Sequence, residues 1–212
     1  MLAIETASEA CSIALFERGA SDVFELLAHD HRVIGRGHAE RLVPMIAALP
    51  DKGKADRILV SLGPGSFTGV RIGLATARAL GFAWQSEVLG YPTLALLATQ
   101  ASRETGELGV TVCMNGGHGE WFVQNFMSGK AQDQVRSLTP ASALEAKKHD
   151  FIVGNRAAEL AVLDPSARAQ ALEMQPDARS VAFLCASVLS TDLAPIYGRA
   201  PDAQPRRVSA LP

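Results

Sequence analysis

The segment that most constrains this chain is a cluster of four glycines within residues 63–73, GPGSFTGVRIG. It follows a short apolar run, residues 57–62, which is typical of a strand covered on both sides. A long helical pattern begins at residue 70 and continues to residue 85. In α/β folds, a glycine-rich connection of this kind leaves backbone N–H groups free to bind an anion at the start of the helix. The cluster therefore predicts an α/β chain with a candidate site at this loop.

The loop matches none of three standard glycine motifs of enzymes. A Walker A loop needs a Gly-Lys-Ser/Thr ending, and residues 63–73 contain no lysine. A dinucleotide fingerprint needs Gly-x-Gly-x-x-Gly, but the third glycine, Gly69, comes one residue too late. A nucleophile elbow needs glycines two residues on either side of Ser66, where the chain has Pro64 and Thr68. The loop therefore indicates none of these three chemistries.

Small residues recur along the predicted helix, because Gly69, Gly73, Ala77 and Gly81 lie four residues apart. This spacing places them on one line of the helix surface. Glycine inside a helix costs about 0.5–1 kcal/mol relative to alanine, so we expect a close contact with another backbone to compensate. That contact is either with a partner protein or with this chain's own sheet. Arg71, beside the stripe, either binds an anion or is a solvated charge at its rim.

The order of elements indicates two similar halves. In the first half we expect strands at residues 1–5, 11–16 and 23–28, a helix at 38–49, a strand at 57–62, a helix at 70–85, a strand at 88–90 and a helix at 93–101. In the second half we expect strands at 109–114, 120–126 and 134–138, a helix at 140–147, a strand at 151–154, and helices at 155–163 and 178–190 before a Pro-rich tail.

Three strands followed by alternating helices and strands form the ribonuclease-H-like unit, which is duplicated in the actin-like ATPases (the ASKHA fold). The predicted fold class is therefore α/β, with two similar βββαβα-type subdomains and mixed sheets. The polar stretch at residues 102–108 separates the two halves. We place the N-terminal subdomain, with the glycine loop, at residues 1–104 and a degenerate C-terminal subdomain with the Pro-rich tail at residues 105–212.

Composition limits what the chain can do. Its 48% of hydrophobic and 20% of charged residues are typical of a globular protein with a core. A net charge of −2 leaves no basic surplus for binding a nucleic-acid backbone directly. The three cysteines, Cys11, Cys113 and Cys185, lack zinc-site spacing, and we expect reduced, buried thiols. No apolar run suits a signal peptide or a membrane span, so we expect a cytoplasmic protein that binds no membrane.

Several stretches resemble one bacterial family, TsaB, also called YeaZ, which takes part in making threonylcarbamoyladenosine (t6A) in tRNA. Residues 63–73 carry the most specific part of the resemblance; residues 4–15 (IETASEACSIAL), 38–44 (HAERLVP), 119–120 (GE) and 195–199 (PIYGR) support it. The resemblance implies a non-catalytic member of the actin-like superfamily. Such proteins pair with TsaD, a catalytic paralogue of related fold, which modifies adenosine 37 of tRNAs that read ANN codons.

The same resemblance implies the partners and the cofactors. The chain would form a heterodimer with TsaD through a helical interface and stabilise it, and would form a homodimer when TsaD is absent. The small ATPase TsaE joins this complex, and tRNA is bound only indirectly. This chain would itself require no cofactor, while ATP could bind at its interface with TsaD.

The residues implied for these roles form two groups. The partner-binding group comprises the helix stripe, its loop and the start of the preceding helix: Gly65, Phe67, Gly69, Arg71, Gly73, Ala77, Gly81 and His38. The cofactor group, which would be vestigial, comprises Glu5, Thr6, Gly63 and Gly65. Glu5 and Thr6 stand where actin-like ATPases place an acid and a hydroxyl near magnesium and phosphates, but glutamate is longer than the family's usual aspartate. The alternative is that Glu5 is a strand-end acid bonded to the turn after it.

The chain lacks the metal ligands of the catalytic paralogue. TsaD proteins carry two metal-binding histidines separated by three residues, and the equivalent stretch here, residues 91–97, has none. His29 and His31 are interpreted as a solvated loop pair. Residues 115–117 (NGG) replace the family's usual Asp-Ala-Arg. No catalytic or metal-binding residue is therefore predicted.

Two other functions stay open from the sequence. The duplicated fold, the Glu5-Thr6 pair and the glycine loop would also suit a small ATP-dependent kinase or ATPase, although no catalytic base beside an acceptor pocket is evident. A peptidase is the remote alternative, because relatives in this superfamily have carried that label. No Ser-His-Asp or Cys-His set supports it.

Overall fold

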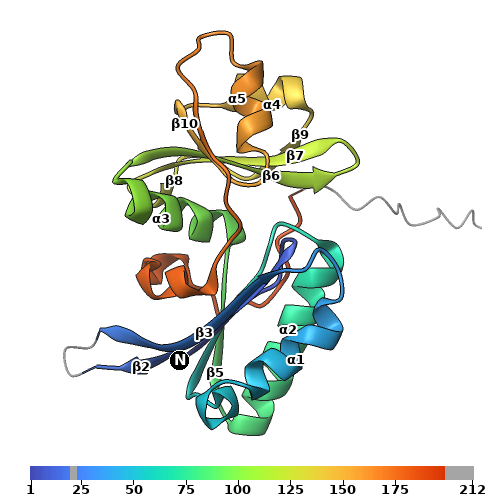
Figure 1. Ribbon diagram of the computed structural model, residues 1–212, viewed down its shortest axis with the longest axis vertical. Helices are drawn as coiled ribbons and strands as arrows, with labels where there is room; N and C mark the ends of the chain where they lie inside the picture. Colours follow the sequence, from blue (N-terminus) through green and yellow to red (C-terminus); the bar gives the residue numbers. More distant parts are fainter. Residues whose placement is uncertain (20–22, 199–212) are drawn as a thin grey trace, which may run out of the picture.

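The computed structural model describes residues 1–19 and 23–198, which form two sheets separated by a helix (Figure 1). The first sheet has the order β3-β2-β1-β4-β5. Its strands are β1 (Leu2–Glu5), β2 (Ala10–Arg18), β3 (Phe24–Val33), β4 (Arg57–Ser61) and β5 (Glu87–Tyr91). The β1 strand pairs antiparallel with β2 and parallel with β4, so the sheet is mixed as predicted.

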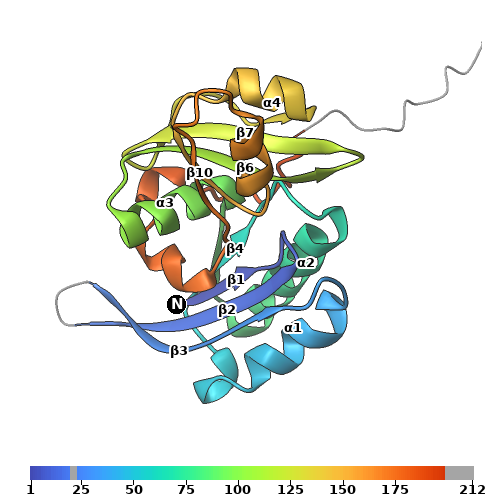
Figure 2. The ribbon, with the colours of Figure 1, turned by 45° about the horizontal axis from the view of Figure 1, so that its top comes forward.

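Two helices cover one face of the first sheet, α1 (His38–Ala47) and α2 (Phe67–Trp84), and a 3-10 turn, η1 (Pro50–Gly53), follows α1. Leu42 of α1 and Leu74 of α2 lie in one buried cluster with Ile4 of β1 and Val60 of β4. Figure 2 shows α1 and α2 side by side beneath this sheet. Burial of such apolar faces is the main source of stability in a domain of this kind.

The second sheet has the order β11-β10-β6-β7-β8, with β9 also paired to β7. Its strands are β6 (Gly109–Gly117), β7 (Glu120–Met127), β8 (Lys130–Ala131), β9 (Arg136–Leu138), β10 (Phe151–Val153) and β11 (Gln170–Leu172). The short helices α4 (Pro140–Ala146) and α5 (Ala157–Leu163) cover its outer face, where Ala143 and Leu160 pack with Ile152. The sequence did not indicate β8 or β11.

Helix α3 (Thr93–Thr105) lies between the two sheets. Leu96 packs into the cluster of the first sheet with Tyr91, whereas Leu94 and Leu97 pack with Val110 of the second sheet. The layers are therefore α1/α2, first sheet, α3, second sheet and α4/α5, and the predicted fold class is confirmed. The proposed division between residues 104 and 105 falls at the end of α3 and stays a prediction.

One predicted helix is wrong. Residues 178–190 form two 3-10 turns, η2 (Ala178–Phe183) and η3 (Ala186–Val188), separated by extended backbone at Leu184. Val181 is buried against the first sheet, and Ser190 forms a bridge with Gly90 at its edge. The segment follows these tertiary contacts, which its helix-like apolar spacing could not indicate. The tail beyond residue 198 lies outside the described residues.

Two side-chain predictions also need correction. Cys11 and Cys113 are free and buried, but the free Cys185 is exposed. His29 and His31 lie on β3, which continues to Val33, rather than in a loop. The Nδ1 atom of His31 lies 3.7 Å from a carboxylate oxygen of Asp177, and this places the ring beside the segment that leads into η2.

The glycine stripe and Gly65 before it pack on this chain's own first sheet and on the turn after β1. A Cβ atom at Gly65 would overlap the carbonyl of Ala7, and one at Gly69 would overlap the carbonyl of Thr6. A Cβ at Gly73 would overlap the Thr6 hydroxyl, which donates a hydrogen bond of 2.8 Å to the Gly69 carbonyl. Further along, Ala77 is fully buried and a Cβ at Gly81 would overlap Val88. Of the two contacts that the sequence allowed, the structure contains the one with the sheet.

Replacement of Gly69 by alanine is expected to destabilise the fold. The added methyl overlaps a backbone carbonyl that cannot rotate away, and overpacking of this kind costs about 1–3 kcal/mol despite the better helix propensity of alanine. Chemical unfolding of Gly69→Ala measures this loss. The matched control is Ala75→Gly on the exposed side of α2, which should cost about 1 kcal/mol. A Gly69→Ala protein as stable as wild type would show that the close contact does not hold α2.

A second buried contact involves the carboxyl group of Glu5, at the end of β1. It is fully buried, accepts a hydrogen bond of 2.7 Å from the Ala7 N–H and lies 3.3 Å from the Tyr91 hydroxyl, which donates to it. Burial raises the pKa of Glu5 to about 7, and these hydrogen bonds oppose part of the rise. The carboxyl therefore stabilises the turn after β1. This is the structural alternative that the sequence left open for Glu5.

The raised pKa makes a stability prediction with a definite sign. The folded chain binds this proton more tightly than the unfolded chain, so the stabilisation is present below pH 4.5 and is lost as the pH rises through about 7. Between about pH 4 and pH 8, wild type should lose about 3 kcal/mol relative to Glu5→Gln. Urea unfolding across this range measures the difference. The control is Glu9→Gln, at an exposed carboxyl, whose free energy of unfolding should change with pH in parallel with that of wild type. If the Glu5→Gln values also ran parallel to wild type, Glu5 would not be the group whose pKa is raised.

Candidate functional site

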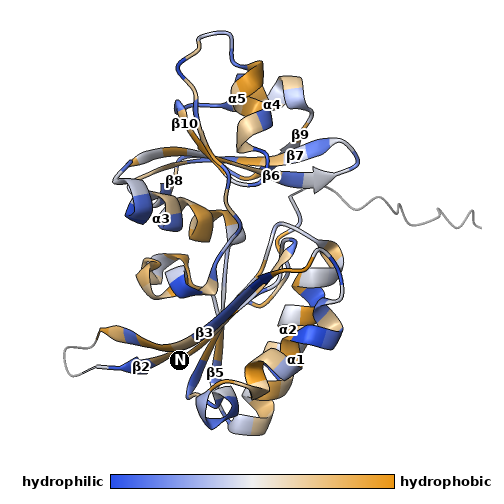
Figure 3. Cartoon of the chain, viewed as in Figure 1, coloured by the Kyte–Doolittle hydropathy of each residue, from blue (hydrophilic) through white to orange (hydrophobic). Residues whose placement is uncertain are grey.

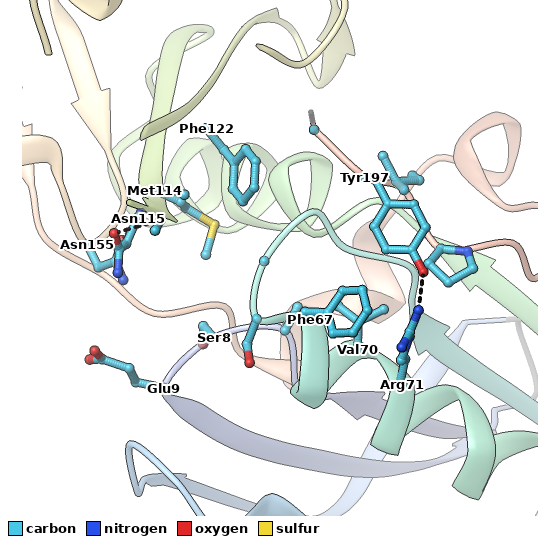
Figure 4. Close-up of a pocket in the computed structure, with 18 of the residues that line it drawn as sticks. Ser8, Glu9, Phe67, Val70, Arg71, Met114, Asn115, Phe122, Asn155 and Tyr197 are labelled. Atoms are coloured by element: carbon cyan, nitrogen blue, oxygen red, sulfur yellow. Dashed lines mark hydrogen bonds between the residues drawn. The ribbon is translucent and has the colours of Figure 1, made fainter. Parts of the chain in front are cut away.

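A cleft of about 700 Å³ opens between the two sheets (Figure 4). The first half of the chain contributes the turn after β1 and the first residues of α2. The second half contributes the end of β6, one residue of β7, Asn155 and the segment at residues 195–198. The volume lies within the range of small-molecule sites. The cleft is the candidate functional site.

The inner wall of the cleft is apolar. Val70 of α2, Met114 of β6 and Phe122 of β7 line it and are almost fully buried, and Ile196 lines it from the C-terminal segment. Figure 4 shows Met114 and Phe122 extending from the second sheet toward Phe67. Both halves of the chain therefore supply apolar atoms to the same wall.

An aromatic and arginine cluster stands at the mouth of the cleft. The guanidinium carbon of Arg71 lies 3.5 Å from the centre of the Phe67 ring, and its nitrogen donates a hydrogen bond of 3.2 Å to the Tyr197 hydroxyl. The two rings lie 5.9 Å apart, inclined at 33°. Phe67 and Tyr197 are 57% and 50% exposed, so much of each ring is uncovered. Stacking and hydrogen bonding together hold the guanidinium in place.

Several polar side chains of the cleft already form hydrogen bonds within the chain. The Asn155 side chain accepts a hydrogen bond of 2.9 Å from the Asn115 N–H, and the Asn115 side chain accepts one from Gly117. The Ser8 hydroxyl accepts a hydrogen bond from the Ala10 N–H. Glu9 is exposed, and its carboxylate points away from Phe67 and Arg71 in Figure 4. Within the part of the chain that the structure describes, Arg71 is the only lysine or arginine that lines the cleft.

The structure separates the predicted partner-binding residues into two sets. Phe67 and Arg71 reach the surface, at the mouth of the cleft. The others face this chain's own core or backbone, and their prediction as a partner surface is corrected: Gly69, Gly73, Ala77, Gly81 and His38. Gly65 packs on the Ala7 carbonyl and is half-buried at the cleft. His38 is buried at the start of α1, with its Nε2 atom 3.2 Å from the Ala10 carbonyl.

The predicted cofactor residues do not form a phosphate site. Glu5 and Thr6 are buried and bonded within the chain, and neither lines the cleft. Gly63 is also buried, and its carbonyl accepts a hydrogen bond from Thr93. Gly65 does line the cleft, where Arg71 is the only lysine or arginine of the described residues. Glu5 and Thr6, the acid and the hydroxyl predicted to meet magnesium and phosphates, are therefore not available to a ligand in this cleft.

Sequence reasoning missed several residues of the cleft. Met114 and Phe122 belong to predicted strands, but strand alternation does not say which face meets a cleft. Tyr197 lies in a stretch quoted for the family resemblance, which was the only available signal for it. Asn155 carried none. Among residues 1–19 and 23–198, no three histidine, cysteine, aspartate or glutamate side chains gather in a way that could hold a metal ion.

Comparison with known proteins identifies the family. The family model described as "TsaD: tRNA N6-adenosine threonylcarbamoyltransferase" matches residues 32–174. The TsaB protein of Escherichia coli is 36% identical over 128 residues, which cover 58% of this chain and 52% of that protein. The TsaB protein of Haemophilus influenzae is 36% identical over 106 residues, covering 48% of this chain and 42% of that protein. The chain thus spans about half the length of these curated relatives.

Two further relatives match over almost the whole chain. An uncharacterized protein of Mycobacterium tuberculosis is 31% identical over 224 residues, covering 98% of this chain and 95% of that protein. The structure of YeaZ from Pseudomonas aeruginosa superposes with a TM-score of 0.71 at 30% identity, covering 86% of this chain and 88% of that one. None of the described helices is long and apolar enough to cross a membrane. Its sequence and its fold together show that this chain belongs to the TsaB (YeaZ) family.

Proposed function

We propose that this chain is a non-catalytic component of the machinery that makes t6A in tRNA, and that it binds and stabilises a TsaD-type paralogue. The names of its curated relatives support the pathway, because they are described as tRNA threonylcarbamoyladenosine biosynthesis proteins. The observation that carries the binding role is an apolar helical surface on α1 and α2 that no described part of the chain covers.

This surface consists of two exposed lines of small residues. On α1 they are Ala39, Val43 and Ala47, and on α2 they are Ala75, Ala79 and Ala83. Each set has four-residue spacing, which places it on one line of its helix. Phe82, beside the second line, is 85% exposed, and Val43 is 55% exposed. In Figure 3, both helices carry apolar residues interspersed with hydrophilic ones. Small residues let helices of a partner approach closely, with the ridges of one between those of the other.

The finer parts of the proposal concern the complex. We infer that the catalytic residues and the tRNA contacts for adenosine 37 of ANN-reading tRNAs belong to TsaD, because this chain has a net charge of −2 and its cleft does not suit magnesium-bound phosphates. TsaE would join the complex in the cytoplasm, ATP would bind only at the interface with TsaD, and a homodimer would use the same helical surface when TsaD is absent.

The kinase and peptidase alternatives gain no support from the site. A kinase needs a nucleotide site, and Glu5 and Thr6 are bonded within the fold. A serine peptidase needs a base beside its nucleophile, but the Ser66 hydroxyl caps α2 by accepting a hydrogen bond from Gly69. No observation therefore favours either alternative.

An arginine at Ala79 tests the proposed surface. Ala79→Arg places a charge and a long side chain in the middle of the contact, and should weaken binding to the TsaD paralogue of the same organism by about 100-fold or more. Calorimetry measures the binding. The same variant should fail to restore t6A, quantified by mass spectrometry, in cells depleted of the wild-type protein.

The control is Ala141→Arg, on the exposed side of α4 in the other half of the chain. It should bind TsaD and restore t6A like wild type. Unchanged binding by Ala79→Arg would rule out this helical surface. Unchanged t6A after depletion of the wild-type protein would rule out the pathway.

A further inference from the structure

We propose that the cleft between the two sheets binds a small aromatic carboxylate, a ligand with a planar apolar ring and one negative charge. The ring would lie against the apolar inner wall and the uncovered rings at the mouth, and the carboxylate would bind Arg71. This site is distinct from the proposed partner surface, which uses the outward lines of α1 and the later turns of α2.

The guanidinium of Arg71 is a preformed anion receptor. It stacks on Phe67 and donates one hydrogen bond to Tyr197, and it makes no other hydrogen bond to residues 1–19 or 23–198. Its remaining N–H groups are therefore free for a ligand. A planar guanidinium can give two parallel hydrogen bonds to a carboxylate, and its fixed position means that little side-chain entropy is lost on binding.

The wall beyond Arg71 suits an aromatic ring. Val70, Met114 and Phe122 present apolar atoms there and leave no charged group to be desolvated. The methionine sulfur makes favourable contacts with aromatic rings. At the mouth, the half-exposed Phe67 and Tyr197 rings offer faces for offset stacking. An aliphatic acid could pack against the apolar wall, but it could not stack on these two rings.

The few charged side chains that line the cleft favour a ligand with one carboxylate over a nucleotide. Among residues 1–19 and 23–198, Arg71 is the only lysine or arginine of the lining, and the one lining carboxylate, Glu9, is exposed and turned away from it. The fixed charge of Arg71 pairs with one carboxylate, whereas a triphosphate would bring several negative charges, and the only other lining side chain of the described residues that can be positively charged is His118, in the turn after β6. The Thr6 hydroxyl and the Glu5 carboxyl form hydrogen bonds within the chain and offer no further contact to a ligand.

Methyl NMR of the whole chain, carrying ¹³C-methyl methionine, tests the proposal. Of the five methionines, only Met114 lines the cleft, so the other four are internal controls. The probes are indole-3-acetate, its uncharged isostere indole-3-acetamide, and MgATP. Indole-3-acetate should shift the Met114 signal with a dissociation constant on the order of 1 mM. The amide should bind about tenfold more weakly, because it lacks the charge that Arg71 recognises.

Variants assign the effect to Arg71. Arg71→Gln should weaken indole-3-acetate by about tenfold and leave indole-3-acetamide nearly unchanged. The control is Arg78→Gln, also exposed on α2 but outside the cleft, where the side chain bonds to the Leu193 carbonyl. It should bind both probes like wild type, with an unchanged thermal midpoint for both variants.

Three results would overturn the proposal. The first is an unmoved Met114 signal at ~10 mM indole-3-acetate, well above the expected dissociation constant. The second is equal binding of the acid and the amide, or no effect of Arg71→Gln, which would remove the role of the charge. The third is binding of MgATP at least as tight as that of indole-3-acetate. Binding to TsaD is measured separately by calorimetry, so the first two results leave the proposed function untouched, whereas tight MgATP binding would also remove one reason for assigning the catalytic residues to TsaD.

Discussion

The close contact between the backbone of residues 6–7 and the glycines at the start of α2 determines much of what this chain presents to solvent. It brings the helix so near β1 that no side chain fits between Gly65 or Gly69 and the facing carbonyls. Two hydrogen bonds cross the same contact. The Thr6 hydroxyl donates to the Gly69 carbonyl, and the Ser66 N–H donates to the Ala7 carbonyl. Because the helix is rigid, this one contact also fixes the direction of every side chain along α2, including Arg71 at the cleft and Ala79 on the outer surface.

The sequence predicts that α2 makes a close contact, but it does not indicate whether the contact is with a partner protein or with the chain's own sheet. Successive residues of a helix turn by about 100°, so Ala75, two residues after Gly73, lies about 200° away from it. The helix thus carries small residues on two opposite sides at the same four-residue spacing, one buried and one exposed. Spacing alone cannot tell them apart. Most strands and helices were predictable because their apolar patterns are local, whereas residues 178–190 follow contacts with Gly90 and the first sheet that no local pattern contains.

The cleft was beyond sequence reasoning for a related reason. Its mouth joins Phe67 and Arg71 to Tyr197, residues from opposite ends of the chain, and its wall needs Met114 and Phe122 from the second sheet. Each of these residues is ordinary in its own segment. Only the stacking of the two sheets about α3 gives them a common function, so the site is a property of the tertiary fold and of no single motif.

The buried acid argues against magnesium binding at the position where ATPases of this fold place a charged carboxylate. A carboxylate that binds magnesium must stay charged and face the cleft, but Glu5 lies in the core, where burial raises its pKa to about 7. Its hydrogen bonds with Ala7 and Tyr91 fix the same turn on which the glycines of α2 rest. The position that would bind a cation thus supports the helix contact, and a charge placed there would weaken that contact. Structural support and phosphate chemistry compete for this turn, which is why the proposals for recognition rest on the outer side of the helices and on the apolar cleft.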